Sequence, residues 1–430
     1  MKGNRTNHEE LSLDFTPEGI PVIVDRLAWS RASAAAVNIG VGSRDEPKEE
    51  HGIAHLLEHL LFKGTKSRSS KEMSELIEAA GGEMNAYTSK EVTSYYVSTL
   101  DYTFPQAQKL LAEIICQPLL AEKDIANEKK VVTQEIRMSE EDPDDHIHDL
   151  LAKTAWKGNP MAHPEAGHVD CVARMGAEEI LDFFQSNYRP PNLVVVATGN
   201  VKSEQVMEWT TAGLDPLQKA KKRRARVPPR FRPSVDVHPK EGEQVYVGIG
   251  FPGVQAAHPD RYVQGLLGGV LGAGTSSRLF QNVREEHGLV YSIYANAHPF
   301  TDCGIFNLFF STSAENADKV MDLIGKEFVK LKQEGLVEGE LGRARSWIKG
   351  MIVRRLEQVE ARMFFLGELY LQSGALMTED DVMESLDRVT PDQVEGMASS
   401  LLDRRMMCAA IHSEEKRGQA LAKSIEGLDF

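Results

Sequence analysis

Hydrophobic and polar residues alternate along this chain with two different periods. Alternating segments rich in β-branched residues predict strands at 34–41, 92–100 and 193–198. Helical spacing of the hydrophobic positions predicts helices at 70–80, 106–117 and 122–138. Because the strands alternate and are not continuously apolar, we expect mostly antiparallel sheets with one face covered by helices, which is an α+β fold.

One strand–loop–helix pattern occurs twice. Residues 37–65 align without a gap with residues 247–275, each residue meeting the one 210 positions later. Eight positions are identical: Val37, Ile39, Gly40, Leu56, Leu57, Leu61, Gly64 and Thr65. Residues 120–136 align in the same way with 336–352, at an offset of 216. Chance similarity between two common units is the alternative, but a register held throughout favours duplication and two homologous domains.

A linker rich in proline and basic residues separates the two copies. It predicts a first domain at 1–213, a linker at 214–240 and a second domain at 241–430. Five prolines in the linker favour extended chain. Its eight Lys and Arg residues between 219 and 232 suggest contact with an acidic surface of the same protein. A nucleic-acid patch is the alternative, although no aromatic residues accompany the charges.

Composition sets broad limits on function. The 430 residues carry a net charge of −15, which favours solubility and argues against nucleic acid as a general partner. The four cysteines are far apart and form no CxxC pair, which suggests free thiols in a reducing compartment. The polar start resembles no signal peptide, and no apolar run approaches about 18 residues, so we expect a cytoplasmic protein without a membrane partner.

The segment His55-Leu56-Leu57-Glu58-His59 carries the clearest chemistry. On a helix, His55 and His59 lie one turn apart on the same face, where two imidazoles can chelate one zinc ion. Glu58 can then reach a zinc-bound water without being a ligand. This is the H-E-x-x-H motif of zinc hydrolases written in the opposite direction.

The second copy keeps the hydrophobic positions but lacks this chemistry. Gly265, Gly268 and Gly269 occupy the positions that correspond to His55, Glu58 and His59. A nucleotide-binding loop at Gly268–Ser277 is an alternative use of these glycines, but the segment lacks the GK[ST] sequence that holds phosphate and magnesium.

A catalytic zinc site needs a third protein ligand. Glu128 and Glu135 are the leading candidates, because residues seven apart share one face of a helix. An ordinary solvated helix face is the alternative interpretation. His146 and His148 form an HxH pair, but they follow an acidic run and are expected in an exposed loop. For His51 we expect a supporting or structural role.

Four sequence blocks, taken together, resemble the pitrilysin/insulinase family of zinc peptidases. The blocks are HGIAHLLEHLLFKGT at 51–65, GGEMNAYT at 81–88, TSYY at 93–96 and GAGTSSRLFQNVREEHGLVYSIYA at 272–295. The chain is most similar to the short branch that includes mitochondrial processing peptidase and its bacterial relatives, and the resemblance covers nearly the whole chain.

The resemblance implies a role for each matching residue. His55, His59 and Glu135 would hold one Zn²⁺ per chain, with Glu128 behind the histidines and Glu58 as the general base. Asn85 and Ala86 would lie on an edge strand that pairs with the substrate backbone. Arg284 and Tyr291 would contact substrate from the second domain.

The resemblance also implies an activity and a partner. The activity would be endopeptidase cleavage of unstructured peptides inside a clam-shell, of which this chain encodes one half. The other half would be a second copy in a homodimer, or a related chain in a heterodimer. A noncatalytic assembly subunit of the same fold is the alternative. The 163–168 segment is only loosely similar to the family loop, and the glycine-rich loop of the noncatalytic processing-peptidase subunit is not evident, so the substrate preference stays open.

Overall fold

The computed structural model describes residues 10–217 and 225–430, which form two compact units. Unit 1 comprises Met1–Arg137, His163–Arg226 and Arg355–Met377, and unit 2 comprises Met138–Ala162, Val227–Arg354 and Thr378–Phe430. The expected ranges, 1–213 and 241–430, differ from these units because each unit contains a segment from the other half of the chain. Both units are α+β, as expected.

Unit 1 is built on one six-stranded sheet. Its strands are β1 (Glu10–Phe15), β2 (Pro21–Arg26), β3 (Ala32–Ile39), β4 (Glu83–Thr88), β5 (Thr93–Leu100) and β6 (Leu193–Gly199). Its helices are α1 (Ile53–Leu61), α2 (Ser70–Ala79), α3 (Phe104–Cys116), α4 (Glu122–Glu141), α6 (Val169–Arg174), α7 (Ala177–Asn187), α8 (Ser203–Leu214) and α12 (Val359–Ser373), with the end of α4 assigned to unit 2. The strand order is β1-β2-β6-β3-β5-β4, and only β2 and β6 pair in parallel.

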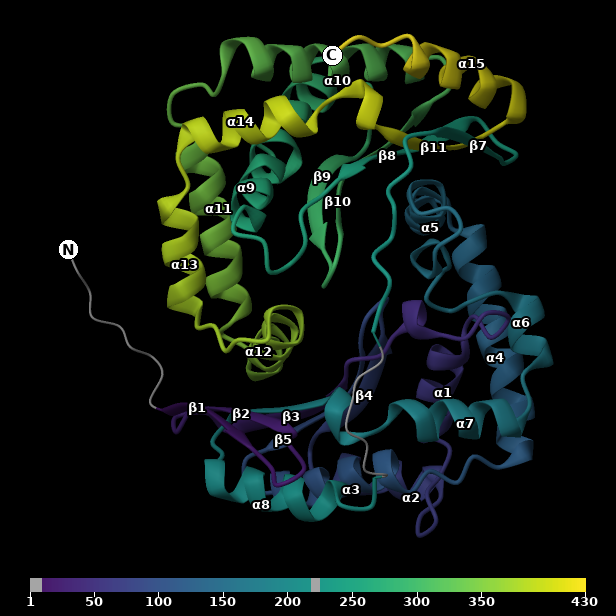
Figure 1. The fold of residues 1–430 in the computed structure, drawn as a ribbon, viewed down its shortest axis with the longest axis vertical. Helices are drawn as coiled ribbons and strands as arrows, with labels where there is room; N and C mark the ends of the chain where they lie inside the picture. Colours follow the sequence, from purple (N-terminus) through teal and green to yellow (C-terminus); the bar gives the residue numbers. More distant parts are fainter. Residues whose placement is uncertain (1–9, 218–224) are drawn as a thin grey trace. The chain divides into compact units, whose positions relative to one another are not determined.

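Both faces of this sheet are covered in its centre, and this corrects the expectation of one covered face. Helices α1, α3 and α8 pack on one face, while α12 lies on the other (Figure 1). Val37 of β3 therefore lies in the core cluster that contains α1 and α3, whereas Ala34 and Ala36 lie in the cluster with α12. Burial on both faces explains why β3 and β6 are almost entirely buried.

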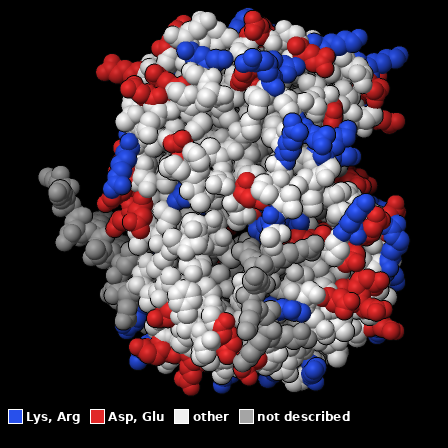
Figure 2. All heavy atoms as spheres, in the orientation of Figure 1, with Lys and Arg blue, Asp and Glu red and all other residues white. Residues whose placement is uncertain are grey.

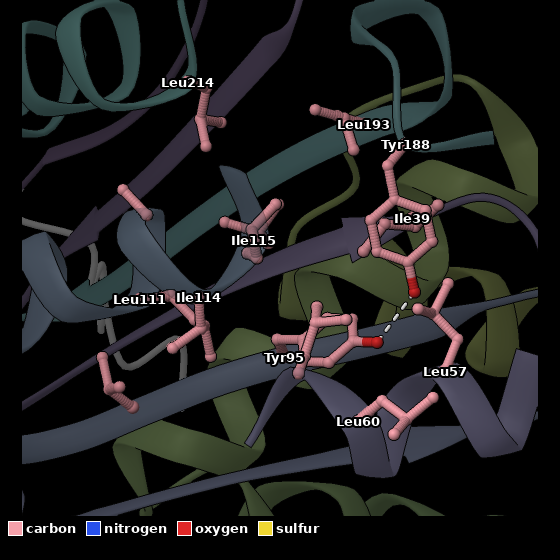
Figure 3. Packing of buried hydrophobic residues seen from close by; sticks show 14 of the residues in the cluster. Ile39, Leu57, Leu60, Tyr95, Leu111, Ile114, Ile115, Tyr188, Leu193 and Leu214 are labelled. Atoms are coloured by element: carbon pink, nitrogen blue, oxygen red, sulfur yellow. Dashed lines mark hydrogen bonds between the residues drawn. The ribbon is translucent and has the colours of Figure 1, made fainter. Parts of the chain in front are cut away.

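The larger core of unit 1 contains a buried pair of tyrosines. Tyr95 of β5 and Tyr188, which follows α7, point toward each other among leucine and isoleucine side chains (Figure 3). Their hydroxyl groups are hydrogen-bonded at 2.7 Å, so neither polar group is left without a partner in the core. Burial raises the pKa of both tyrosines, and both therefore stay neutral. Leu57 and Leu60 of α1 belong to the same cluster and fix that helix against the sheet.

Unit 2 is built on a five-stranded sheet. Its strands are β7 (Val235–Pro239), β8 (Gln244–Pro252), β9 (Ile293–Pro299), β10 (Gly304–Ser313) and β11 (Cys408–Ser413). Its helices are α5 (Pro143–Ala155), α9 (Arg261–Gly272), α10 (Ala317–Glu334), α11 (Glu340–Arg355, its last residue in unit 1), α13 (Glu379–Arg388), α14 (Pro391–Leu401) and α15 (Glu415–Glu426). The strand order is β7-β11-β8-β10-β9, with only β7 and β11 parallel.

The two sheets have equivalent topologies. Apart from β1, which has no counterpart, the order β2-β6-β3-β5-β4 matches β7-β11-β8-β10-β9 strand by strand in chain order, including the one parallel pair in each sheet. The helices that follow correspond as well, with α1 matching α9 and α4 matching α11. Chance similarity of one strand–helix unit does not explain this agreement, and the duplication extends over both sheets.

Two helices are exchanged between the halves of the chain. Helix α5, from the first half, packs on β8 and β11 of unit 2, and α12, from the second half, packs on β3 and β6 of unit 1. Arg362 of α12 forms a buried ion pair with Asp25 of β2, with Nε and Oδ2 at 2.8 Å. Removing one partner of such a pair typically costs about 3–5 kcal/mol, so this contact fixes α12 firmly on its sheet.

The position of α5 corrects the expectation that His146 and His148 lie in a loop, although His148 is exposed as expected. Both lie on α5. The ring of His148 packs 4.0 Å from the ring of Phe309, and His146 lies 5.5 Å from the ring of His412. Burial lowers the pKa of His146 to about 4, so it is neutral at pH 7. These histidines pack α5 onto the sheet of unit 2.

Within the described residues, no helix combines the length and apolar character needed to cross a bilayer. On the face drawn in Figure 2, basic and acidic side chains are interspersed. Although the net charge is −15, that face shows no single continuous acidic patch.

Candidate metal centre

Helix α1 carries the candidate metal ligands and is held firmly at its start. Its apolar residues, including Leu56 and Leu57, are fully buried in the core of unit 1. The residue before the helix, Gly52, has no side chain to cap it, and the carboxylate of Glu46 supplies that function. Its oxygens accept hydrogen bonds from the backbone N–H groups of Gly52 at 2.9 Å and Ala54 at 3.0 Å. A carboxylate at this end of a helix is favoured by the helix dipole.

Three expected metal ligands come together in unit 1. His55 and His59 of α1 and Glu135 of α4 each offer one ligand atom, and these atoms lie within 4.8 Å of one another. The Nε2 atom of His59 is 3.3 Å from Oε2 of Glu135, and the Nε2 atom of His55 is 3.8 Å from the same oxygen. The two histidines of the motif and the distant glutamate thus lie close enough together to bind one metal ion.

Protonation of this cluster suits a metal. Burial lowers the pKa of His55 to about 4, and the neighbouring His59 contributes in the same direction. His55 is therefore a neutral imidazole at pH 7, which is the form that binds a metal ion. Glu135 has 42% of its side-chain surface exposed, so the cluster is open to solvent on one side.

Glu128 lies behind the histidines, and it does not lie on a solvated face. Its side chain is 7% exposed, and Oε2 is 3.3 Å from Nδ1 of His59. Its second oxygen, Oε1, is 2.9 Å from Nζ of Lys63. A carboxylate in this place fixes the orientation of the imidazole, as is common for groups behind metal-binding histidines.

Glu58 is buried beside the ligands and has a defined partner. Its Oε2 atom accepts a hydrogen bond of 2.5 Å from the hydroxyl of Thr88, at the end of β4. Burial raises the pKa of Glu58, while the Thr88 hydrogen bond opposes that rise. A raised carboxylate pKa brings the group closer to the range in which it can both accept and return a proton. Thr88 belongs to a block quoted above, but no spacing rule identifies it as a partner of Glu58.

Asn85 and Ala86 lie on β4, which is an edge strand of the unit 1 sheet. Asn85 pairs with Tyr96 and Ala86 with Tyr95, both on β5, along one side of the strand. Within the described residues no strand pairs along the other side, so an added strand could pair there once the Ala86 N–H is released from the Asn85 Oδ1 atom, to which it donates at 2.8 Å.

Arg284 and Tyr291 lie close together in unit 2. Arg284 is in a π-helical segment, Phe280–Glu286, and its guanidinium lies 5.3 Å from the centre of the Tyr291 ring. Tyr291 is 83% exposed, so it is not the core tyrosine that its apolar neighbours would otherwise suggest. An exposed aromatic ring held beside an arginine is suited to contact another chain or a substrate.

The equivalent position in unit 2 carries no side chains that could bind a metal ion, and it is crowded at Gly269 but open at Gly265, the counterpart of His55. A side chain on Gly269, the counterpart of His59, would meet Ile348 and Ala344 of α11 at 3.1 and 3.2 Å. Gly268, the counterpart of Glu58, lies under β9 near Ala295. In this copy α11 packs against α9, in place of a metal site.

A histidine cluster near the start of α1 was not expected from the sequence. The rings of His51 and His163 stack with centroids 3.6 Å apart, and Nδ1 of His163 is 3.0 Å from Nε2 of His168. The structural role expected for His51 agrees with this packing. His163 and His168 have no spacing that relates them to His51, so only the fold reveals the cluster.

Two family models and a relative of similar length match this chain. Residues 22–168 match the family model described as Insulinase (Peptidase family M16), and residues 174–346 match the model described as Peptidase M16 inactive domain. An uncharacterized zinc protease of Streptomyces coelicolor is 36% identical over 403 residues, which cover 92% of this chain and 88% of that protein.

Solved structures share the fold. A protease from Helicobacter pylori has a TM-score of 0.86 at 23% identity, covering 94% of this chain and 99% of that chain. A chain of complex III2 from Candida albicans has a TM-score of 0.84 at 18% identity, covering 97% and 100%. At these identities the likeness shows the fold alone.

Proposed function

Because this chain belongs to the insulinase family, peptidase family M16, we propose that it is a zinc-dependent endopeptidase that hydrolyses unstructured peptides. The observation that carries the proposal is the convergence of His55, His59 and Glu135 beside the buried Glu58. Membership of the family and the names of its relatives support a zinc protease, and the donor set adds the residues that would do the chemistry.

The donor set fits zinc. Two imidazoles and one carboxylate are the protein ligands of many catalytic zinc sites, which leave a position open for water or substrate. The exposure of Glu135 provides that open side. A zinc ion bound there would polarise the scissile carbonyl group and make a water molecule more acidic.

Residues of this chain would carry the proton and align the groups. Glu58 would take a proton from the attacking water and return it to the leaving amine. Thr88 would hold the Glu58 carboxylate in place, and Glu128 would hold the His59 ring. A substrate added antiparallel to β4 would lie beside α1, since α1 and β4 are in contact.

A paired assay tests the proposal against the alternative of a noncatalytic assembly subunit. We expect the purified protein to contain zinc and to cleave internally quenched, unstructured peptides. Removal of zinc by a chelator should abolish cleavage, and adding zinc back should restore it. Bound zinc without cleavage of a broad peptide library would favour the noncatalytic alternative. A chain of complex III2, which is part of a larger assembly, has the same fold.

The homodimer remains part of the proposal. We infer that Arg284 and Tyr291 act on peptide held at the zinc site of a second copy, because both the zinc ligands and this exposed pair are present in one chain. The alternative is a heterodimer, in which a related chain supplies the second half of the shell. The cytoplasmic location and the single zinc ion per chain also stay predictions.

Mixing two inactive variants tests the shared site. Glu58→Gln and Arg284→Ala should each lose hydrolysis, and a mixed dimer should contain one site with both groups intact. With free exchange of equal amounts, about one quarter of all sites should recover activity. Arg284→Ala mixed with the Glu58→Gln/Arg284→Ala double variant is the matched control and should stay inactive. Equal activity in both mixtures would show that the site is not shared.

A further inference from the structure

The side chain of Arg226, at the end of unit 1, makes an unusually complete set of contacts for a linker residue. Its Nε and Nη2 atoms donate to the two carboxylate oxygens of Asp45 at 2.8 and 2.6 Å. Nη2 also lies 3.1 Å from the carbonyl of Gly40 and 2.9 Å from the carbonyl of Glu91. Nη1 is 3.1 Å from Oε1 of Glu91.

These contacts are buried. The side chains of Arg226, Asp45 and Glu91 are 10%, 9% and 8% exposed. The expected contact between the basic linker and an acidic surface is therefore present at this residue, while residues 218–224 lie outside the described part of the chain. The cluster also contains Arg44, whose Nη1 donates to the same Glu91 oxygen at 2.6 Å. Because buried charges depend on their partners, the two guanidinium groups and the two carboxylates hold one another in place.

One side of the cluster leads to the zinc-binding helix. Asp45 fixes the turn before α1, since its Oδ2 also accepts a hydrogen bond of 3.0 Å from the backbone N–H of Gly42. The next residue, Glu46, caps α1 through Gly52 and Ala54. The position of α1, and of His55 one residue further on, is thus tied to this turn.

The other side of the cluster leads to the edge strand β4. Glu91 lies in the hairpin between β4 and β5, three residues after Thr88. The turn and the hairpin are in backbone contact, with Ser43 N–H donating to Ser89 C=O at 3.0 Å. A β-carbon on Gly42 would lie 2.2 Å from the same Ser89 oxygen, so only glycine permits this approach.

We propose that Arg226 is a positioning residue, which fastens the turn before α1 to the β4–β5 hairpin and so aligns Glu58 and the zinc ligands with the edge strand. This inference rests on the proposed peptidase function. The guanidinium reaches both segments at once because its donors form a planar fork, and a lysine could not make the same set of contacts. The linker thereby contributes to the site without touching substrate or metal.

Substitution of Arg226 tests the proposal by kinetics. Arg226→Met should lower kcat for a quenched peptide about 10- to 100-fold with little change in KM and with full zinc content, because small misalignments of reacting groups have effects of that size. Arg226→Lys should recover part of the loss. Arg230, an exposed arginine four residues further on, provides the matched control, and Arg230→Met should behave as wild type.

Hydrogen–deuterium exchange gives a readout that does not need catalysis. Arg226→Met should increase exchange both in residues 40–54 and in residues 88–92, whereas β8 and α9 in unit 2 should be unaffected. If Arg226→Met does not fold, Arg226→Lys carries the same test with a smaller expected increase.

Two outcomes would overturn the proposal. One is an unchanged kcat together with unchanged exchange in both segments. The other is an equal loss in the Arg230→Met control, which would indicate a general role for linker charge. If the wild-type protein cleaves no peptide, the proposed function fails, but the exchange pattern still decides whether Arg226 fastens the two segments.

Discussion

Replacing Glu58 with glutamine should leave zinc binding intact and lower peptide hydrolysis by about 10²- to 10⁴-fold. The amide has nearly the shape of the carboxylate, so it can keep the contact with the Thr88 hydroxyl. It cannot accept a proton from water, and the step that depends on proton transfer fails. Because Glu58 is not among the three converging ligands, the metal content should not change.

The test of Glu58 requires that the zinc content of the variant be measured and that another glutamate be replaced with glutamine as a control. Glu78 is an exposed glutamate on α2, and Glu78→Gln should retain near wild-type hydrolysis. Both variants should be compared on the same unstructured peptide after contaminating proteases have been removed. Wild-type rates from zinc-loaded Glu58→Gln would exclude Glu58 as the general base.

Glutamine substitutions at Glu135 and Glu128 should have different effects, although the two residues share one helix. Glu135→Gln should lose most of its zinc, and hydrolysis with it, because a neutral amide is a poor replacement for a carboxylate ligand. Glu128→Gln should keep the site but weaken zinc affinity about 10- to 100-fold, as is typical when a group that orients a ligand is changed. Its hydrolysis should return at saturating zinc.

Zinc titration followed by peptide assay at each concentration separates these roles. Thermal unfolding serves as the control, because Glu128 also pairs with Lys63 and its loss could loosen α4. Recovery of Glu135→Gln at zinc concentrations that also restore Glu128→Gln would mean that Glu135 is not a ligand. If Glu128→Gln stays folded but does not regain hydrolysis at saturating zinc, Glu128 has a role in the reaction beyond orienting His59.

Part of the candidate site could be predicted from the sequence because it depends on local spacing. His55, Glu58 and His59 lie within one helical turn, and the duplicated segment with glycines marked that turn as the special copy. Glu135 needed the family resemblance, since spacing alone left a solvated helix face open. The structure brings Glu135 of α4 to the two histidines of α1, and sequence periodicity carries no information about which helices of a fold meet.

The residues that contact this site from distant parts of the sequence were less predictable, because local spacing does not show which segments meet in the fold. Thr88 contacts Glu58 only because β4 ends beside α1, and Arg226 reaches Asp45 across 181 positions of sequence. The strands and the duplication followed from periodicity, whereas the exchange of helices did not. An amphipathic helix shows that one of its faces will be buried, but the pattern does not say against which sheet.

The exchanged helices impose an order on biosynthesis. All six strands of the unit 1 sheet have left the ribosome once residue 199 has emerged, but the helix that covers its second face ends at Ser373. Until then Ala34, Ala36 and Val196 present an apolar surface to water. The half of the chain that holds the candidate zinc ligands therefore cannot complete its packing while it is being made. We expect its sheet to keep one apolar face uncovered, and so to be prone to aggregation, until the second half has been translated.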